Sequence, residues 1–237
     1  MSLCRLGLLS LLTSTLVGCS SFVDGNGVYA ELTFDAGSRD LGPFDGAVIG
    51  FSSDVDVSGH PLTASIVVDG GAARQVVLSG DENVIQHIHP RVDGHGVLRT
   101  EIDVDGYSSV HPPQLRVKAT GLASLGSVGS VGGAEITALG AAAASFSVTA
   151  SSGGHVVLSG AGGSTLSVAL SGGALLDAAA YPVTSAELAL SGASSATVWP
   201  SGELSGTIAS GSTVLVKGPV TCAGVVVSGA GSACGPL

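Results

Sequence analysis

The four cysteines carry the most reactive side chains of the chain and occupy positions 4, 19, 222 and 234. Cys19 ends the sequence Leu16-Val17-Gly18-Cys19, which directly follows a mostly apolar run behind Arg5. A basic start, a short apolar run and small residues before a cut are typical of secretory signals. A cysteine right after the cut is typical of bacterial lipoproteins, in which the thiol receives a diacylglycerol. We therefore predict that residues 1–18 form a cleaved signal peptide and that Cys19 is lipidated.

The alternatives for this segment are an ordinary signal peptide with a chance cysteine, or a short buried strand. The apolar run is too short to span a bilayer as a helix, which takes about 20 residues. Acyl chains would instead hold the protein at the membrane, stably once two or more insert. Ser20, rather than an aspartate, follows Cys19. This favours the outer membrane over the inner one for an exported, lipid-anchored envelope protein.

Cys222 and Cys234 remain once Cys4 is removed with the signal and Cys19 is acylated. Thiols of exported proteins are normally oxidised, so we expect these two to form a disulfide. The alternative is a pair of buried, inert thiols.

Histidines gather in the first half of the chain, and their nitrogens could bind zinc. His87, His89 and His95 are the candidates. His87 and His89 also sit at the end of a predicted short helix, where histidine favourably meets the helix dipole. We expect the second role and predict no metal site.

The acidic run from Glu101 to Gly106 resembles the start of a calcium-binding loop, but Pro112 stands where such a loop needs glutamate. Alternating acids on a solvated strand explain this run better. We predict no cofactor.

Catalysis on polysaccharide would need a clustered acid and base. A glycosidase uses two carboxylates on either side of the scissile bond. Residues 120–237 contain few charged side chains, namely Glu135, Asp177, Glu187, Glu203 and Lys217. They fall at different phases of the repeat described below, so we predict no catalytic residues. The alternative is an enzyme acting on envelope polysaccharide, with its substrate between the two halves of the chain.

The charge of the chain excludes several partners. The formal net charge is −10 at pH 7, and loss of Arg5 with the signal makes the mature protein more negative still. Nucleic-acid binding depends on basic patches, so we predict no nucleic-acid partner. Electrostatic adhesion to anionic lipid is disfavoured for the same reason.

The second half, residues 120–237, consists largely of Gly, Ser, Ala and branched aliphatic residues, and it repeats. Alternating apolar stretches flank small-residue turns at Ser151, Ser171, Ser191, Ser210 and Ser228. Two short strands and a turn roughly every 20 residues are typical of a β-solenoid, whose inward side chains line up between stacked units. Leu188 is predicted to point inward and Thr197 outward. The alternative is low-complexity sequence without a fixed fold.

The first half reads as irregular β-structure. Strands are expected over 47–51, 53–57, 63–68, 75–78, 101–105 and 115–118, and a strand, a turn and another strand over 92–98. A short helix is expected over 81–89, with Asp81 as its N-cap. Gly70-Gly71 is expected to be a hairpin turn. The expected organisation is a signal peptide (1–18), a tether or linker (19–39), an N-terminal β half (40–119) and a solenoid half of the same domain (120–237).

The order of several motifs resembles the auto-transporter adhesin head family, also called the GIN domain family. These are Ser79-Gly80-Asp81-Glu82-Asn83-Val84-Ile85, then Val92-Asp93-Gly94 with Gly96-Val97-Leu98, then the strand Leu115–Ala119 and the ladder of Ser-Gly turns. The similarity covers roughly residues 40–235. It implies a right-handed parallel β-helix in exported, often lipid-anchored envelope proteins, with no catalytic residues. This chain differs in having fewer Ser-Gly-Ser-Gly-Asp turns and more alanine.

The sequence therefore predicts an all-β, right-handed parallel β-helix or β-solenoid with a more irregular N-terminal β half. We expect it to serve as a non-enzymatic binding or structural surface. Its partners would be the membrane, through the lipid anchor, and glycan or another envelope protein. A third hypothesis is an assembly subunit with a flat, exposed apolar end repeat.

Overall fold

Strands dominate the fold because apolar and polar side chains alternate along most of the chain, a pattern that buries one face of a strand. The computed structural model describes residues 21–35, 41–51, 55–58, 60–69, 74–128 and 134–237. Its strands and helix are, in chain order, β1 (Phe22–Asp24), β2 (Tyr29–Asp35), β3 (Gly46–Gly50), β4 (Asp56–Ser58), β5 (Thr63–Val68), β6 (Gln75–Asp81), α1 (Glu82–Ile85), β7 (Ile88–Val92), β8 (Val97–Ile102), β9 (Gly106–Ser108), β10 (Gln114–Ala119), β11 (Ser124–Val128), β12 (Glu135–Ala141), β13 (Ser145–Ala150), β14 (His155–Gly160), β15 (Gly163–Leu170), β16 (Leu175–Leu190), β17 (Ser195–Ile208), β18 (Thr213–Val216), β19 (Gly224–Val227) and β20 (Ala233–Pro236). The prediction of an all-β protein is confirmed.

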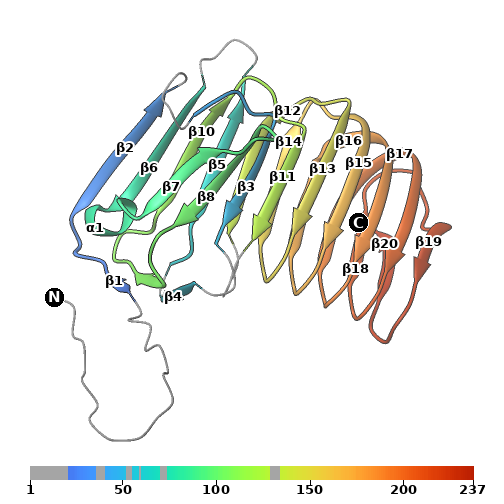
Figure 1. Cartoon of the computed structure of the whole chain (residues 1–237). Helices are drawn as coiled ribbons and strands as arrows, with labels where there is room; N and C mark the ends of the chain where they lie inside the picture. The colour runs from blue at the N-terminus through green and yellow to red at the C-terminus, as the bar shows by residue number, and fades with distance from the viewer. Residues whose placement is uncertain (1–20, 36–40, 52–54, 59, 70–73, 129–133) are drawn as a thin grey trace, which may run out of the picture.

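Two broad faces enclose the core (Figure 1). Face A has the strand order β7, β8, β3, β11, β13, β15, then the second halves of β16 and β17, then β19. Face B has the order β2, β6, β10, β5, β12, β14, then the first halves of β16 and β17, then β18 and β20. β16 and β17 are long because each runs from face B around a bend into face A.

From β13 onward each repeat is a face A strand, a tight turn, a face B strand and a bend, and successive repeats pair in parallel. Equivalent positions are in register, as in Val148 opposite Val168 and Val168 opposite Leu188. The inward members of these rows are buried, so apolar columns run from repeat to repeat. The predicted phase of the inward columns is therefore confirmed from Phe146 to Val216.

The tight turns explain the small residues. Gly172 and Gly173 have φ angles of 61° and 78°, a conformation that side chains other than glycine rarely adopt. The turns also stack closely: a Cβ placed on Gly192 would lie 2.8 Å from the backbone nitrogen of Gly172. Turns of one repeat thus rest directly on those of the next.

The last repeat departs from the prediction. Ala223, Val225 and Val227 alternate before the turn at Ser228, a pattern that predicts inward side chains, yet Val225 is only partly buried, Val227 is 43% exposed and Ala223 is exposed. In the described part of the chain β19 pairs only with β17, so no further strand covers these side chains.

The N-terminal half is not a simple continuation of the stack. The repeat β3–β4–β5 lies between β8–β9–β10 and β11–β12, although it precedes β8 in sequence. Three strand pairs are antiparallel: β2 with β6, β6 with β10, and β7 with β8. The sheet is therefore mixed and open in this half, which the sequence predicted to be more irregular than the repeats; the parallel β-helix implied by the family resemblance does not describe it.

Two local predictions bear on the strands of this half. The hairpin predicted at Gly70-Gly71, which lies outside the described residues, would pair β5 with β6. Instead β10 lies between them, parallel to β5 and antiparallel to β6. The helix expected over 81–89 is limited to α1, because His89 belongs to β7 and pairs with Glu101 on β8.

Most of the segment expected to be a linker is part of the fold. β1 pairs in parallel with β9, which also pairs with β4, and these three strands form a small third sheet. β2 pairs with β6 along its full length, from Tyr29 opposite Asp81 to Asp35 opposite Gln75. The linker interpretation of residues 19–39 is therefore wrong for β1 and β2.

Cys222 and Cys234 are joined by a disulfide whose Cα atoms lie 6.1 Å apart. The bond connects the segment before β19 to β20 and so closes the last repeat. We expect Cys222→Ser/Cys234→Ser to lower the free energy of unfolding by about 2–3 kcal/mol, since the chain loses a short covalent loop. Urea unfolding of the double variant measures this. Two free thiols per chain on the unfolded, unreduced protein lacking Cys19 would show that the bond does not form.

Candidate functional site

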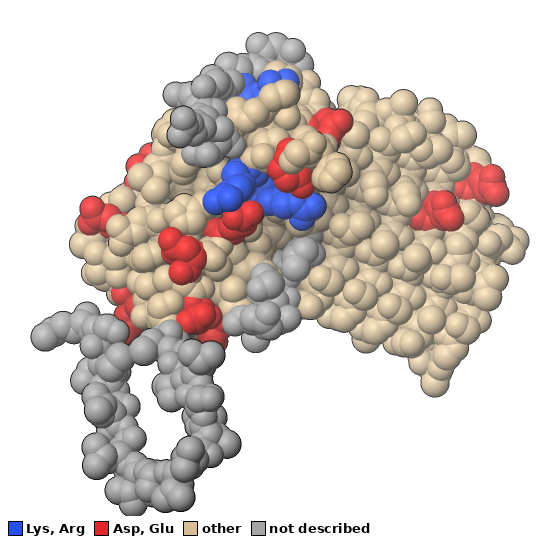
Figure 2. Space-filling view, in the orientation of Figure 1, with Lys and Arg blue, Asp and Glu red and all other residues tan. Residues whose placement is uncertain are grey.

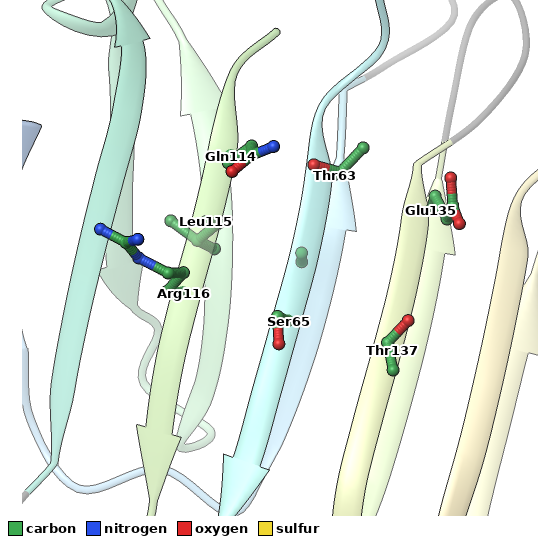
Figure 3. A pocket seen from close by; sticks show the side chains of 8 residues that line it. Thr63, Ser65, Gln114, Leu115, Arg116, Glu135 and Thr137 are labelled. Carbon is green, nitrogen blue, oxygen red and sulfur yellow. The ribbon is translucent and has the colours of Figure 1, made fainter. Parts of the chain in front are cut away.

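A polar groove crosses three neighbouring strands of face B (Figure 3). Its volume is about 330 Å³, and its walls come from β10, β5 and β12. The strands are parallel and in register, so their outward side chains form two rows across the groove. The first row is Gln114, Thr63 and Glu135, and the second is Arg116, Ser65 and Thr137.

The alternation of the strands determines which side chains reach the groove. In β10 the pattern is regular, with Gln114, Arg116 and Lys118 exposed and the residues between them buried. Leu115 and Ala64 complete the floor of the groove and belong to the buried core. The groove is thus a polar surface on a rigid apolar base.

An ion pair limits one end of the groove. The guanidinium of Arg116 binds the carboxylate of Glu31 on β2, and in Figure 3 it extends away from Ser65, toward β6. Hydrogen bonds from the Tyr29 hydroxyl and from Arg116 lower the pKa of Glu31. Glu31 therefore stays ionised and holds Arg116 at this edge.

The groove offers amide, hydroxyl, carboxylate and guanidinium groups on adjacent strands. Such groups donate and accept the hydrogen bonds that sugar hydroxyls make. Glu135 is the single carboxylate among the lining residues, whereas a glycosidase requires two that face each other.

The histidines predicted as possible zinc ligands are held by a carboxylate. Nδ1 of His87 lies 2.7 Å, and Nε2 of His89 3.1 Å, from the two oxygens of Asp103. Hydrogen bonds from His89 and His87 lower the pKa of Asp103. His95 lies in the turn between β7 and β8, where its backbone N–H donates to Asp93. Among the described residues, no group of three or more His, Cys, Asp or Glu side chains is arranged to hold a metal ion.

The acids of the 101–106 segment serve different partners. Glu101 pairs with Arg91 at 3.2 Å, Asp103 with the two histidines, and Asp105 accepts from the backbone N–H of Ser21 at 2.5 Å. They do not converge on one point. The interpretation of a solvated, structural run agrees with this arrangement.

Asp81 does not act as the predicted helix cap, because its side chain makes no capping hydrogen bond. Its fully buried carboxylate instead accepts from the backbone N–H of Val110 at 2.7 Å and from Nδ1 of His111 at 2.8 Å. Burial opposes ionisation, but these bonds outweigh it, so the pKa of Asp81 lies below its ordinary value. The residue fixes the connection between β9 and β10, and hence the start of the groove.

Charge is concentrated in the N-terminal half, as Figure 2 shows. The C-terminal half presents an almost uncharged face in this view, with two acidic spots. Lys217, the one basic residue after position 120, donates to the carbonyl of Ala179 at 2.8 Å and lies 3.8 Å from the centre of the Trp199 ring. Its role is to hold two bends together.

Comparison with known proteins decides the family. Residues 53–219, more than half of the chain, match the family model described as "Putative auto-transporter adhesin, head GIN domain". The chain belongs to this family. The resemblance that the motif order indicated is thereby confirmed, and the match crosses from the irregular half of this GIN-domain protein into its repeats.

Solved structures show the same fold at low sequence identity. A putative adhesin from Bacteroides fragilis aligns with a TM-score of 0.64 at 12% identity, over 90% of this chain and 99% of that one. A putative adhesin from Parabacteroides merdae gives 0.54 at 15%, over 92% and 100%. A protein from Parabacteroides distasonis described as a putative lipid binding protein gives 0.50 at 15%, over 90% and 96%. No curated protein matches the sequence significantly.

The groove of this GIN-domain protein does not follow from the sequence. The outward positions of β5 and β10 follow from their alternation. However, Ser65 and its partner Arg116 lie 51 positions apart in the sequence, and no local pattern indicates that these strands are neighbours. Within the described part of the chain, no helix is long and apolar enough to cross a membrane.

Proposed function

We propose that this protein is a lipid-anchored, non-enzymatic surface protein of the cell envelope that binds glycan through the face B groove. The observation that carries the proposal is the groove itself: two in-register rows of polar side chains on a rigid base. The family, described as a putative adhesin, and the structurally similar proteins described as putative adhesins support a role at the cell surface.

The stacked repeats support an extended partner. We infer that they form a right-handed β-solenoid, as the family resemblance implies. The rows of the groove continue on face B: Glu135 is followed by His155, and Thr137 by Val157. A glycan chain lying across the strands would contact equivalent positions on several successive strands. A globular partner would not contact such a row along its length.

The groove is tested with a printed array of neutral and acidic oligosaccharides. We expect Gln114→Ala/Glu135→Ala to lose the array signal of the wild-type chain, because two hydrogen-bonding groups leave one row. The matched control, Glu187→Ala/Thr207→Ala, removes an acid and a polar group from exposed positions on face A and should keep the signal. Absence of any bound glycan on the wild-type chain, or equal loss in both variants, would refute the groove.

The lipid anchor is tested separately. Cys19→Ser removes the thiol that would receive the diacylglycerol, so we expect the variant to leave the membrane fraction and to lose incorporation of a radioactive fatty acid. Ser2→Ala, a change within the predicted signal, serves as the control and should leave labelling intact. Unchanged labelling of Cys19→Ser would show that the anchor lies elsewhere or does not exist.

A further inference from the structure

The folded body begins almost immediately after the residue proposed to carry the lipid. Ser21 is already part of the fold. Its backbone N–H donates to the carboxylate of Asp105, and its carbonyl accepts from the Asp105 backbone nitrogen at 2.8 Å. β1 starts at the next residue. Two residues of extended chain reach at most about 7 Å. A lipid on Cys19 would therefore bring this end of the protein against the bilayer.

The same end exposes apolar side chains. Phe22 lies in β1, Val28 and Tyr29 lie where β2 begins, and Val110 follows β9, the partner of β1; their exposures are 43%, 52%, 54% and 63%. The ring of Tyr29 packs edge-on against His111, 5.8 Å between centroids, which places it beside Val110. We call Phe22, Val28, Tyr29 and Val110 the N-terminal apolar patch.

These positions are fixed by the surrounding structure. The Val28 carbonyl accepts from the Glu82 nitrogen at 2.7 Å, and the Val110 nitrogen donates to Asp81. Asn83 bridges the loop between β1 and β2, accepting from Asn26 and donating to the Asp24 carbonyl. Because the backbone is held in this way, the exposed apolar side chains need little further ordering to bind.

From these two independent observations we infer that the N-terminal apolar patch seats directly on the lipid bilayer, and that the C-terminal repeats point away from it. The inference rests on the proposed anchor at Cys19. Aromatic side chains such as those of Phe22 and Tyr29 suit the membrane interface, where an amphipathic ring meets both water and acyl chains.

The exposed charges at this end of the protein indicate which lipid headgroup the patch would contact. Asp24 on β1, Glu82 on α1 and Asp105 before β9 are exposed; the backbone N–H of Glu82 donates to the Val28 carbonyl, and that of Asp105 donates to the Ser21 carbonyl. They disfavour anionic headgroups, so the surface fits a zwitterionic phospholipid bound through apolar contact. The last repeat lies at the opposite end of the stack, with Val226 64% exposed on β19 (Figure 1).

Tryptophan quenching tests the seating. The chain contains a single tryptophan, so Trp199→Phe provides a silent background. In the lipidated full chain on phosphatidylcholine vesicles, Val110→Trp should be quenched about two-fold or more by brominated acyl chains, since interfacial groups insert about 5–10 Å. The matched control is Val226→Trp, equally exposed at the distal end, which should not be quenched. Phe22→Trp gives a second, conservative probe should Val110→Trp fail to fold.

The outcomes distinguish contact of the N-terminal apolar patch with the bilayer, here called the seating, from lipidation at Cys19. If the chain floats with the vesicles but neither probe is quenched, the anchor stands and the seating is wrong. Quenching of both ends alike also overturns the seating. If the chain does not float at all, the anchor fails and the seating with it.

Discussion

Replacing Leu188 with aspartate is expected to lower the free energy of unfolding by roughly 4–5 kcal/mol. Leu188 is 1% exposed and lies in the apolar column between Val168 and Gly206 of the neighbouring repeats. The substitution removes a packed side chain and leaves a carboxylate without a partner, and both effects are costly in a core. For a chain of this size the melting temperature should fall by more than about 10 °C.

The control is the next residue along the strand. Ala189 points outward and is exposed, so Ala189→Asp should change the stability by no more than about 0.5 kcal/mol. Calorimetry or circular dichroism melts of both variants measure the difference. Equal melting temperatures would mean that the strand does not have the phase described above.

Asp81→Ala is expected to cost about 3 kcal/mol of stability. The variant removes a buried acceptor and leaves the partly buried backbone N–H groups of Val110 and His111 without their partner, and an unpaired donor shielded from water is costly. The loss should show as a lower urea midpoint. It should also loosen the loop before β10, which amide hydrogen exchange of Val110 would detect.

Asp103→Ala is the matched control, because it also removes a carboxylate that binds histidine. Asp103 is 56% exposed, and such surface pairs contribute about 0–1 kcal/mol. A loss as large as that of Asp81→Ala would contradict the difference in burial on which the prediction depends.

The effect of Asp81 should depend on pH. Its pKa in the folded protein lies below the ordinary value of 3.8, so the folded state favours the ionised carboxylate. The resulting stabilisation is complete well above pH 3.8 and is lost as the pH falls through the lower, folded pKa. The difference between wild type and Asp81→Ala should therefore be largest near neutral pH and shrink in acid.

The sequence by itself determined the parts of the fold that depend on neighbours along the chain. The alternation around Val148, Val168 and Leu188 predicted both the strands and their buried side, because side-chain direction reverses at every residue of a strand. The small-residue turns predicted the repeat length. The motif order from Ser79 to the Ser-Gly turns indicated the family that the model match then showed.

Only the tertiary structure decided what depends on which strands meet. No local pattern tells that β10 lies between β5 and β6, or that the β3–β5 repeat follows the β8–β10 repeat in space. The groove therefore appears only in three dimensions, since Thr63, Gln114 and Glu135 become neighbours through that order.

The segment after Cys19 shows the same division. Its sequence is short, polar at intervals and without a repeat, features that indicate a linker. Pairing of β1 with β9 and of β2 with β6 makes it part of the body. Strand pairing gains its stability from partners far away in sequence, and the patterns within a segment do not identify those partners. The sequence determined that strands form and which side they bury, and the tertiary contacts determined what those strands build.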